Sequence, residues 1–122
     1  MSFEADWRRC ASWIDAALEH AGRTHGLDDV EALLRAGDAQ LWAGEKSAIV
    51  TEMNDYPRAK VLSFWLAGGD LDELINVLRP KAEAFGRAHG CSQVAILGRA
   101  GWERALRGAG YEPAARLVMK DL

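Results

Sequence analysis

Hydrophobic positions in residues 6–22 recur with the spacing of an amphipathic helix, at i, i+3, i+4 and i+7. A second stretch, residues 27–37, repeats this spacing over a shorter length. Asp6 is suited to cap the first helix and Gly22 to end it, while Gly37 is suited to end the second. The pattern therefore predicts two helices at the start of the chain.

The period of the pattern then changes from that of a helix to that of strands. Residues 39–44, 46–57 and 58–69 are rich in Val, Ile, Thr and aromatic side chains. Short connectors containing Gly, Asn, Asp and Pro separate them. Connections this short join antiparallel neighbours, so the three segments are predicted to form an antiparallel meander.

Residues 70–90 form the longest predicted helix. Asp70 and Glu73 have the spacing of a capping box at its start. Pro80 falls in the middle, where its ring and its missing N–H disturb the preceding turn, so a kink is expected near Asn76. A buried strand over 92–98, a short helix and a final strand "ARLVMKDL" complete the chain.

This order of elements, α-α-β-β-β-α-β-α-β, determines the expected fold class. A strand, a long helix and a further strand imply one parallel crossover. With the antiparallel meander before it, the chain is predicted to be an α+β protein, a mixed α/β sandwich with helices on both sheet faces. We expect residues 1–122 to form a single domain.

Composition excludes several classes of function. The 122 residues are 49% hydrophobic and 27% charged with a net charge of −3, and no basic run interleaves with aromatics. We therefore expect no nucleic-acid partner. No apolar run is long enough for a membrane span and no signal-peptide pattern is visible, so a cytoplasmic location is expected. Neither the three histidines nor Cys10 and Cys91 have metal-ligand spacing, and the two cysteines are expected to be free thiols.

The element order and the last third of the chain resemble the GNAT (GCN5-related N-acetyltransferase) superfamily. The matching pieces are "AEAFGRAHGCSQVAIL", "RAGWERALRGAGYEP" and "ARLVMKDL". More narrowly, "QLWAG", "AIVTEMNDYPR" and "LGRAGWERALRGAGYEP" are similar to small GNAT-like proteins of phage and prophage genomes. The resemblance implies a GNAT-like fold and raises the question of acetyl-CoA binding.

The family holds the acetyl-CoA diphosphate on a glycine-containing turn before its long helix. The resemblance places Gly68 and Gly69 there as candidate cofactor-binding residues. The Arg or Gln of the family motif is missing before them, and three carboxylates (Asp70, Asp72 and Glu73) follow. Carboxylates there complement the helix dipole and repel a diphosphate. A well-capped helix after a glycine turn explains these residues without a cofactor.

The family's general acid is a tyrosine in the closing helix, and an asparagine before it orients the cofactor. Aligned on Gly110 and Tyr111, this chain has Leu106 at the position of the acid and Arg99 at that of the asparagine. Leucine cannot donate a proton, and Arg99 remains a candidate cofactor contact. Trp102 stands where a small residue is usual, and its bulk suits either core packing or a blocked cofactor groove. Tyr111 is expected to pack its ring under the last strand with its hydroxyl at the rim.

Glu52 is the one candidate for a general base. Family members often place a carboxylate near this position of the middle strand. The alternation in "AIVTEMN" puts Val50 and Glu52 on one face and Thr51 and Met53 on the other. A base is useful only beside a bound acyl donor.

Two functions follow from these residues. The first is a GNAT-fold protein without acetyltransferase activity that serves as a binding or assembly component, with a phage or phage-derived particle as one setting. Its partner would be a protein, a virion component or a second copy meeting the exposed sheet edge, and no acetyl-CoA binding is expected. The alternative is an atypical acetyl-CoA-dependent N-acetyltransferase with Glu52 as general base. A nucleic-acid mimic has only the mild net acidity in its favour.

Overall fold

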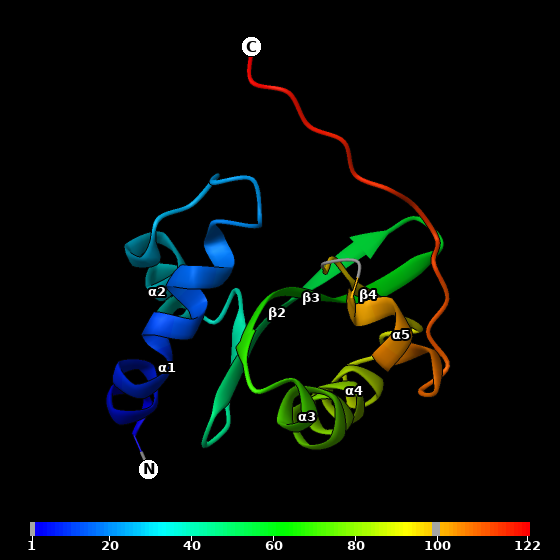
Figure 1. Cartoon of the computed structure of the whole chain (residues 1–122). Helices are drawn as coiled ribbons and strands as arrows, with labels where there is room; N and C mark the ends of the chain where they lie inside the picture. The colour runs from blue at the N-terminus through cyan, green and yellow to red at the C-terminus, as the bar shows by residue number, and fades with distance from the viewer. Residues whose placement is uncertain (1, 99–100) are drawn as a thin grey trace.

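The computed structural model describes residues 2–98 and 101–122 (Figure 1). Helical and strand segments follow in the order α-α-β-β-β-α-β-α. They are α1 (Phe3–Leu18), α2 (Leu27–Ala36), β1 (Gln40–Ala43), β2 (Ser47–Tyr56), β3 (Ala59–Gly69), α3 (Leu71–Glu73), the π-helical η1 (Leu74–Leu78), α4 (Arg79–Ala88), β4 (Gln93–Ile96) and α5 (Gly101–Arg107).

The strands form one mixed sheet in the order β1-β2-β3-β4. β1, β2 and β3 pair antiparallel, as the short connectors predict, and β4 lies parallel to β3 after the crossover through the long helix. Both the meander and the parallel step are confirmed. The fold is α+β.

Helices cover both faces of the sheet, and each face has its own apolar cluster (Figure 1). On one face, α1 and α2 pack against β1, β2 and β3; the buried residues there include Trp7, Cys10, Ile14, Leu18, Val30, Ala48, Val50 and Leu66. On the other face, η1 and α4 pack against the sheet; the buried residues are Ile49, Leu62, Phe64, Leu74, Leu78 and Ala82. The predicted covering of both faces is therefore present.

Helix α1 begins earlier than the sequence pattern indicates. The residue at its N-cap is Ser2, whose hydroxyl accepts a hydrogen bond from the Ala5 N–H at 3.2 Å, so the expected cap at Asp6 is wrong. The helix also ends at Leu18, before Gly22. A serine hydroxyl is a good N-cap, and the spacing of apolar residues alone does not predict that the helix begins at Ser2. Helix α2 ends at Gly37, as predicted, in the left-handed conformation.

The long helix is interrupted at the position that Pro80 predicts. Pro80 occupies the first turn of α4, and the preceding segment η1 is a π-helix. The Arg79 N–H bonds to the Leu74 carbonyl, five residues back, and the Arg79 Nε donates to the Ile75 carbonyl at 2.9 Å. Pro80 has no backbone N–H to donate to a carbonyl of the preceding turn. The wider turn and the Arg79 side-chain bond provide donors for carbonyls of that turn instead.

The final predicted strand is absent. Residues 111–122 contain no helix or strand. In Figure 1 they run from α5 past the turn between β2 and β3, and the Met119 side chain lies beside Gly22 in the connection between α1 and α2. The second half of the fold is therefore β-α-β-α, and the expected closing strand is wrong. A segment with strand-like composition becomes a strand only when its backbone finds a partner.

Candidate functional site

Strands β3 and β4 diverge in the middle of the sheet. They pair from Val61 with Gln93 to Phe64 with Ile96, where β4 ends while β3 continues to Gly69. The register between β2 and β3 shifts at the same level, because Val50 pairs with Leu66 and Thr51 with Phe64. Trp65 is thus the extra residue of a bulge, which bends the strand. The edge of β3 from Trp65 to Gly69 that faces β4 has no strand partner within the described residues.

Glu52 lies one residue along the sheet from the point where β3 and β4 diverge. It pairs with Ser63, which is the neighbour of Phe64 in the last β3–β4 pair. Its side chain is on the α1 face, because Val50 packs in the α1 cluster whereas Thr51 accepts a hydrogen bond from Trp42 Nε1 on the other face at 2.9 Å. The predicted alternation is confirmed. The residue is half-buried, and among the described residues its carboxylate has no ion pair or hydrogen-bond partner.

A second polar pair occupies the same face beside Glu52. The Ser63 hydroxyl donates to Asn54 Oδ1 at 2.7 Å. Ser63 lies between Leu62 and Phe64, whose side chains point into the apolar cluster under α4. A carboxylate, an amide and a hydroxyl therefore lie together on the part of the sheet just beyond the apolar cluster under α1.

The connection between α1 and α2 packs against the bulge. The His25 imidazole contacts the Trp65 indole edge-on, with ring centroids 4.7 Å apart, and shares a 2.7 Å hydrogen bond with the Thr24 hydroxyl. His25 also lines a cavity of about 420 Å³ together with Asp29 and Leu33. The sequence does not predict this contact, because a histidine between two helices carries no periodic signal that links it to a distant strand.

Gly68 and Gly69 both have packing roles. A Cβ at Gly68 would lie 2.6 Å from the Trp13 carbonyl oxygen of α1. Gly69 has φ of +105°, and a Cβ there would collide with the Lys46 carbonyl oxygen. Only glycine suits these positions. A role for either residue in cofactor binding stays a prediction, as does one for Arg99, which lies outside the described residues.

Glu73 reaches from the helix to the turn between β1 and β2. Its carboxylate accepts hydrogen bonds from the Ser47 hydroxyl, the Lys46 N–H at 3.0 Å and the Glu45 N–H at 3.3 Å. The Ser47 bond, with the two backbone bonds, lowers the pKa of Glu73 despite its partial desolvation. The carboxylate of Glu73 thus occupies two backbone N–H groups that an external anion could otherwise use.

Half of the predicted capping box is present. The Asp70 carboxylate accepts the Glu73 N–H at 2.9 Å, so the N-cap is confirmed. The reciprocal bond is absent from the described contacts, because the Asp70 N–H donates to the Lys46 carbonyl instead. Negative charge therefore gathers at the turn where the resemblance places the diphosphate.

The closing helix packs as a structural element. Leu106 is 5% exposed, and Trp102 packs against the apolar cluster under α4, as its bulk predicts. Tyr111 lies under no strand, contrary to expectation; its hydroxyl donates to Glu83 Oε2 at 2.6 Å, an atom that Arg79 also contacts at 2.6 Å. Burial and this bond raise the pKa of Tyr111, which makes it a poor proton donor.

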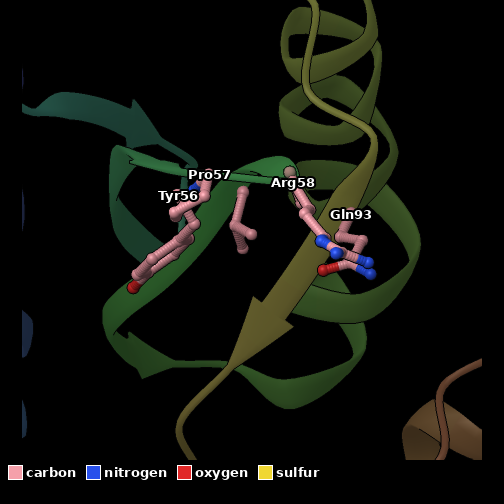
Figure 2. Close-up of a pocket in the computed structure, with 6 residues that line it drawn as sticks. Tyr56, Pro57, Arg58 and Gln93 are labelled. Atoms are coloured by element: carbon pink, nitrogen blue, oxygen red, sulfur yellow. The ribbon is translucent and has the colours of Figure 1, made fainter.

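A second hollow lies at the other end of β3. It has a volume of about 580 Å³ and is lined by residues of the β2–β3 turn and the start of β4: Tyr56, Pro57, Arg58, Ala59, Val61 and Gln93. In Figure 2 the Arg58 and Gln93 side chains lie together, with Tyr56 on the other side of the strand. Its lining holds no carboxylate, thiol or imidazole, and its ionisable side chains are Tyr56 and Arg58.

Other chemistry has little support in the described part of the chain. No group of three or more His, Cys, Asp or Glu side chains there is arranged to hold a metal ion. Cys10 and Cys91 are free, and burial raises the pKa of the Cys10 thiol, which disfavours the nucleophilic thiolate. None of the described helices combines the length and hydropathy needed to cross a bilayer.

No family model and no curated protein sequence matches the chain. Solved structures match over nearly its whole length. Glucosamine-6-phosphate N-acetyltransferase from Arabidopsis thaliana is 13% identical, with a TM-score of 0.68 over 96% of this chain and 92% of that one. A protein from Thermus thermophilus is 17% identical, with a TM-score of 0.67 over 99% and 93%. An aminoglycoside N-acetyltransferase in complex with CoA is 13% identical, with a TM-score of 0.63 over 88% and 85%.

The chain therefore has the fold of the GNAT acetyltransferases, as the sequence resemblance implies. Identities this low establish the fold alone. The narrower resemblance to phage proteins gains no support from these comparisons.

Proposed function

We propose that this protein is an atypical acetyl-CoA-dependent N-acetyltransferase in which Glu52 is the general base. The observation that carries the proposal is the position of Glu52, a half-buried carboxylate without a partner among the described residues, one row from the point where β3 and β4 diverge. The fold shared with N-acetyltransferases over most of the chain favours this function over a purely structural one.

The open edge of β3 is the proposed donor site. The pantetheine arm of acetyl-CoA contains two amides, and an open strand edge can hydrogen-bond to them as it does to a peptide. Trp65 to Gly69 supply that edge, directly beyond the last β3–β4 pair. The thioester at the end of a pantetheine arm bound there would lie close to Glu52.

Glu52 would take the proton that the acceptor amine loses. A neutral amine attacks the thioester carbonyl carbon, forming the C–N bond, and the C–S bond then breaks to release the thiolate. The carboxylate accepts the amine proton directly or through one water. Leu106 supplies no acid at the family's position, but a thiol has a pKa of about 8.5, so a thiolate is an acceptable leaving group.

The diphosphate of acetyl-CoA fits the glycine turn poorly. Gly68 and Gly69 are closely packed by neighbouring backbone, and Glu73 occupies the nearby N–H groups. Asp70 and Asp72 add negative charge at the same end of the helix. We therefore place the main donor contacts on the pantetheine arm and assign the diphosphate little binding energy.

Release of free thiol from acetyl-CoA, measured with a panel of small amines and amine-bearing peptides, tests the proposal. Glu52→Gln should lower kcat by about a hundredfold or more, which is the typical contribution of general base catalysis. Asp55→Asn is the matched control, because Asp55 is an exposed carboxylate of the same strand. Equal activity of wild type and Glu52→Gln would refute the assigned base.

A binding or assembly component without catalytic activity is the second candidate. The carboxylates around the glycine turn and the buried Leu106 favour it, because both depart from what an acetyl-CoA site needs. Its partner would be another protein, with a phage-derived particle as one setting. Absence of both donor binding and thiol release would select this candidate.

A further inference from the structure

The sheet face that carries Glu52 continues beyond α1 as an open surface. Val94 and Ile96 of β4 belong to the apolar cluster under α4. The residues that alternate with them, Gln93 and Ala95, therefore point to the face of α1, and both are exposed. Helices α1 and α2 thus leave the β4 end of this face uncovered.

Two cross-strand rows on this face connect Glu52 with the hollow at the β2–β3 turn. The first row consists of Glu52, Ser63 and Ala95, and the second of Asn54, Val61 and Gln93. Neighbouring rows on one face are two residues apart, which is about 7 Å. Val61 and Gln93 also line the hollow, whose volume is about 580 Å³. The hollow therefore begins one row from the proposed base.

The hollow combines an apolar floor with a positively charged rim. Val61 is only 8% exposed, and Ala59 precedes it on the same face of β3. At the rim the exposed Arg58 side chain lies beside that of Gln93 (Figure 2). Within the described part of the chain Arg58 forms no ion pair, and no carboxylate lines the hollow. These features favour a ligand with an apolar body and a carboxylate, the group that a guanidinium binds through two parallel hydrogen bonds.

The spacing between Glu52 and Gln93 limits the length of such a ligand. Two strand spacings separate these residues across the sheet and one row separates them along it, so their backbones are about 12 Å apart. The Glu52 carboxylate and the Arg58 guanidinium thus cannot both contact an α-amino acid, whose amine and carboxylate share one carbon atom. A longer chain can reach both groups, and the direct path between them crosses β3 beside Val61.

We propose that the acceptor is a linear ω-amino carboxylate, which binds with its carboxylate on Arg58 and its amine beside Glu52. The Gln93 amide donates a second hydrogen bond to the carboxylate, and Val61 packs against the methylene chain. Acetyl transfer to the amine gives an amide that keeps the carboxylate. The inference rests on the proposed function, and it assigns Arg58 to the selection of the acceptor and not to catalysis.

Thiol release with two acceptors that differ only at one end tests this selectivity. 8-Aminooctanoate should be preferred to 8-aminooctanamide by about fivefold in kcat/KM, the upper range for a partly exposed ion pair, with the difference mainly in KM. Arg58→Gln should abolish the preference. Arg8→Gln is the matched control, because it removes the same charge from an exposed arginine of α1 and should retain the preference. Equal use of both acceptors by the wild type would overturn the proposal.

Binding measured without turnover separates this proposal from the proposed function. In NMR titrations with millimolar 8-aminooctanoate and no acetyl donor, the Val61 methyl and Gln93 side-chain amide signals should shift in the wild type and in Glu52→Gln. They should not shift in Arg58→Gln. Such shifts without thiol release would support the hollow as a carboxylate site and refute the catalytic role of Glu52. Thiol release with amine acceptors but without these shifts would leave the catalytic proposal standing and refute the acceptor class.

Discussion

The carboxylate of Glu73 accepts a hydrogen bond from the Ser47 hydroxyl and so joins the start of the long helix to the start of β2. Two backbone N–H groups of the turn before Ser47 point to the same carboxylate. An internal anion thereby holds the glycine turn, the helix and the first hairpin together. This relationship explains why the acidic helix start is compatible with the fold and why it disfavours a diphosphate there.

Ser47→Ala should destabilise the fold by about 1 kcal/mol, the usual net value of a lost hydrogen bond, discounted here because the acceptor is close to solvent. The measurement is the midpoint of urea unfolding. Ser92→Ala is the control, because Ser92 is exposed and makes no described side-chain bond. Equal midpoints for wild type and Ser47→Ala would contradict the structural role of this bond.

Stability should decrease as the pH falls below about 4, the ordinary range for glutamate. Hydrogen bonding lowers the pKa of Glu73. Burial raises the pKa of Glu83, but bonds from Tyr111 and Arg79 outweigh it, so the net direction is also downward. Groups with a lowered folded-state pKa contribute stability above their unfolded pKa and lose it as the pH falls through the folded one. Glu73→Gln should flatten this slope in chemical denaturation between about pH 3 and pH 5; an unchanged slope would contradict it.

Tyr111→Phe should destabilise the fold by about 1–2 kcal/mol, because the substitution leaves a partly buried carboxylate with one donor fewer. It should leave acetyl transfer unchanged, because Tyr111 is tied to Glu83 and is not placed in the proposed site. Thermal unfolding and thiol release measure the two effects. Tyr56→Phe, at an exposed tyrosine, is the control. Loss of activity without loss of stability would instead indicate a role in catalysis.

Gly68→Ala should destabilise the fold by about 1–3 kcal/mol, as overpacking does, because the added Cβ meets the Trp13 backbone. Gly108→Ala is the matched control, since a Cβ there has no neighbour within 4 Å. Urea unfolding of the two variants gives the comparison. If Gly68→Ala were as stable as wild type, the packing of α1 on this glycine would be wrong.

Acetyl-pantetheine, which lacks the diphosphate and nucleotide, should replace acetyl-CoA with a KM within about threefold. The reason is that carboxylates crowd the glycine turn, and partly exposed electrostatic contacts contribute little. Thiol release with each donor measures the ratio. A preference for acetyl-CoA of about a hundredfold or more would place substantial binding energy on the diphosphate, contrary to the proposed donor site.

Local patterns predicted much of the fold, including the meander, the end of α2 at Gly37 and the distortion before Pro80. Each of these depends on residues close together in sequence. The predicted closing strand is wrong, because the composition of "ARLVMKDL" favours an extended backbone but does not determine which strand that backbone would pair with. The contact between His25 and Trp65 was invisible because it joins a loop to a bulge that only the assembled sheet creates. The family resemblance singled out Glu52 and the alternation assigned its face, but its nearness to the divergence of β3 and β4 depends on the register of three strands.

Titration calorimetry with acetyl-CoA and with CoA is the decisive test of the proposed donor site. We expect binding of one donor molecule per chain, retained in Glu52→Gln while thiol release is lost. The absence of measurable heat with either ligand at millimolar concentration would contradict it and would favour a binding component built on the same fold.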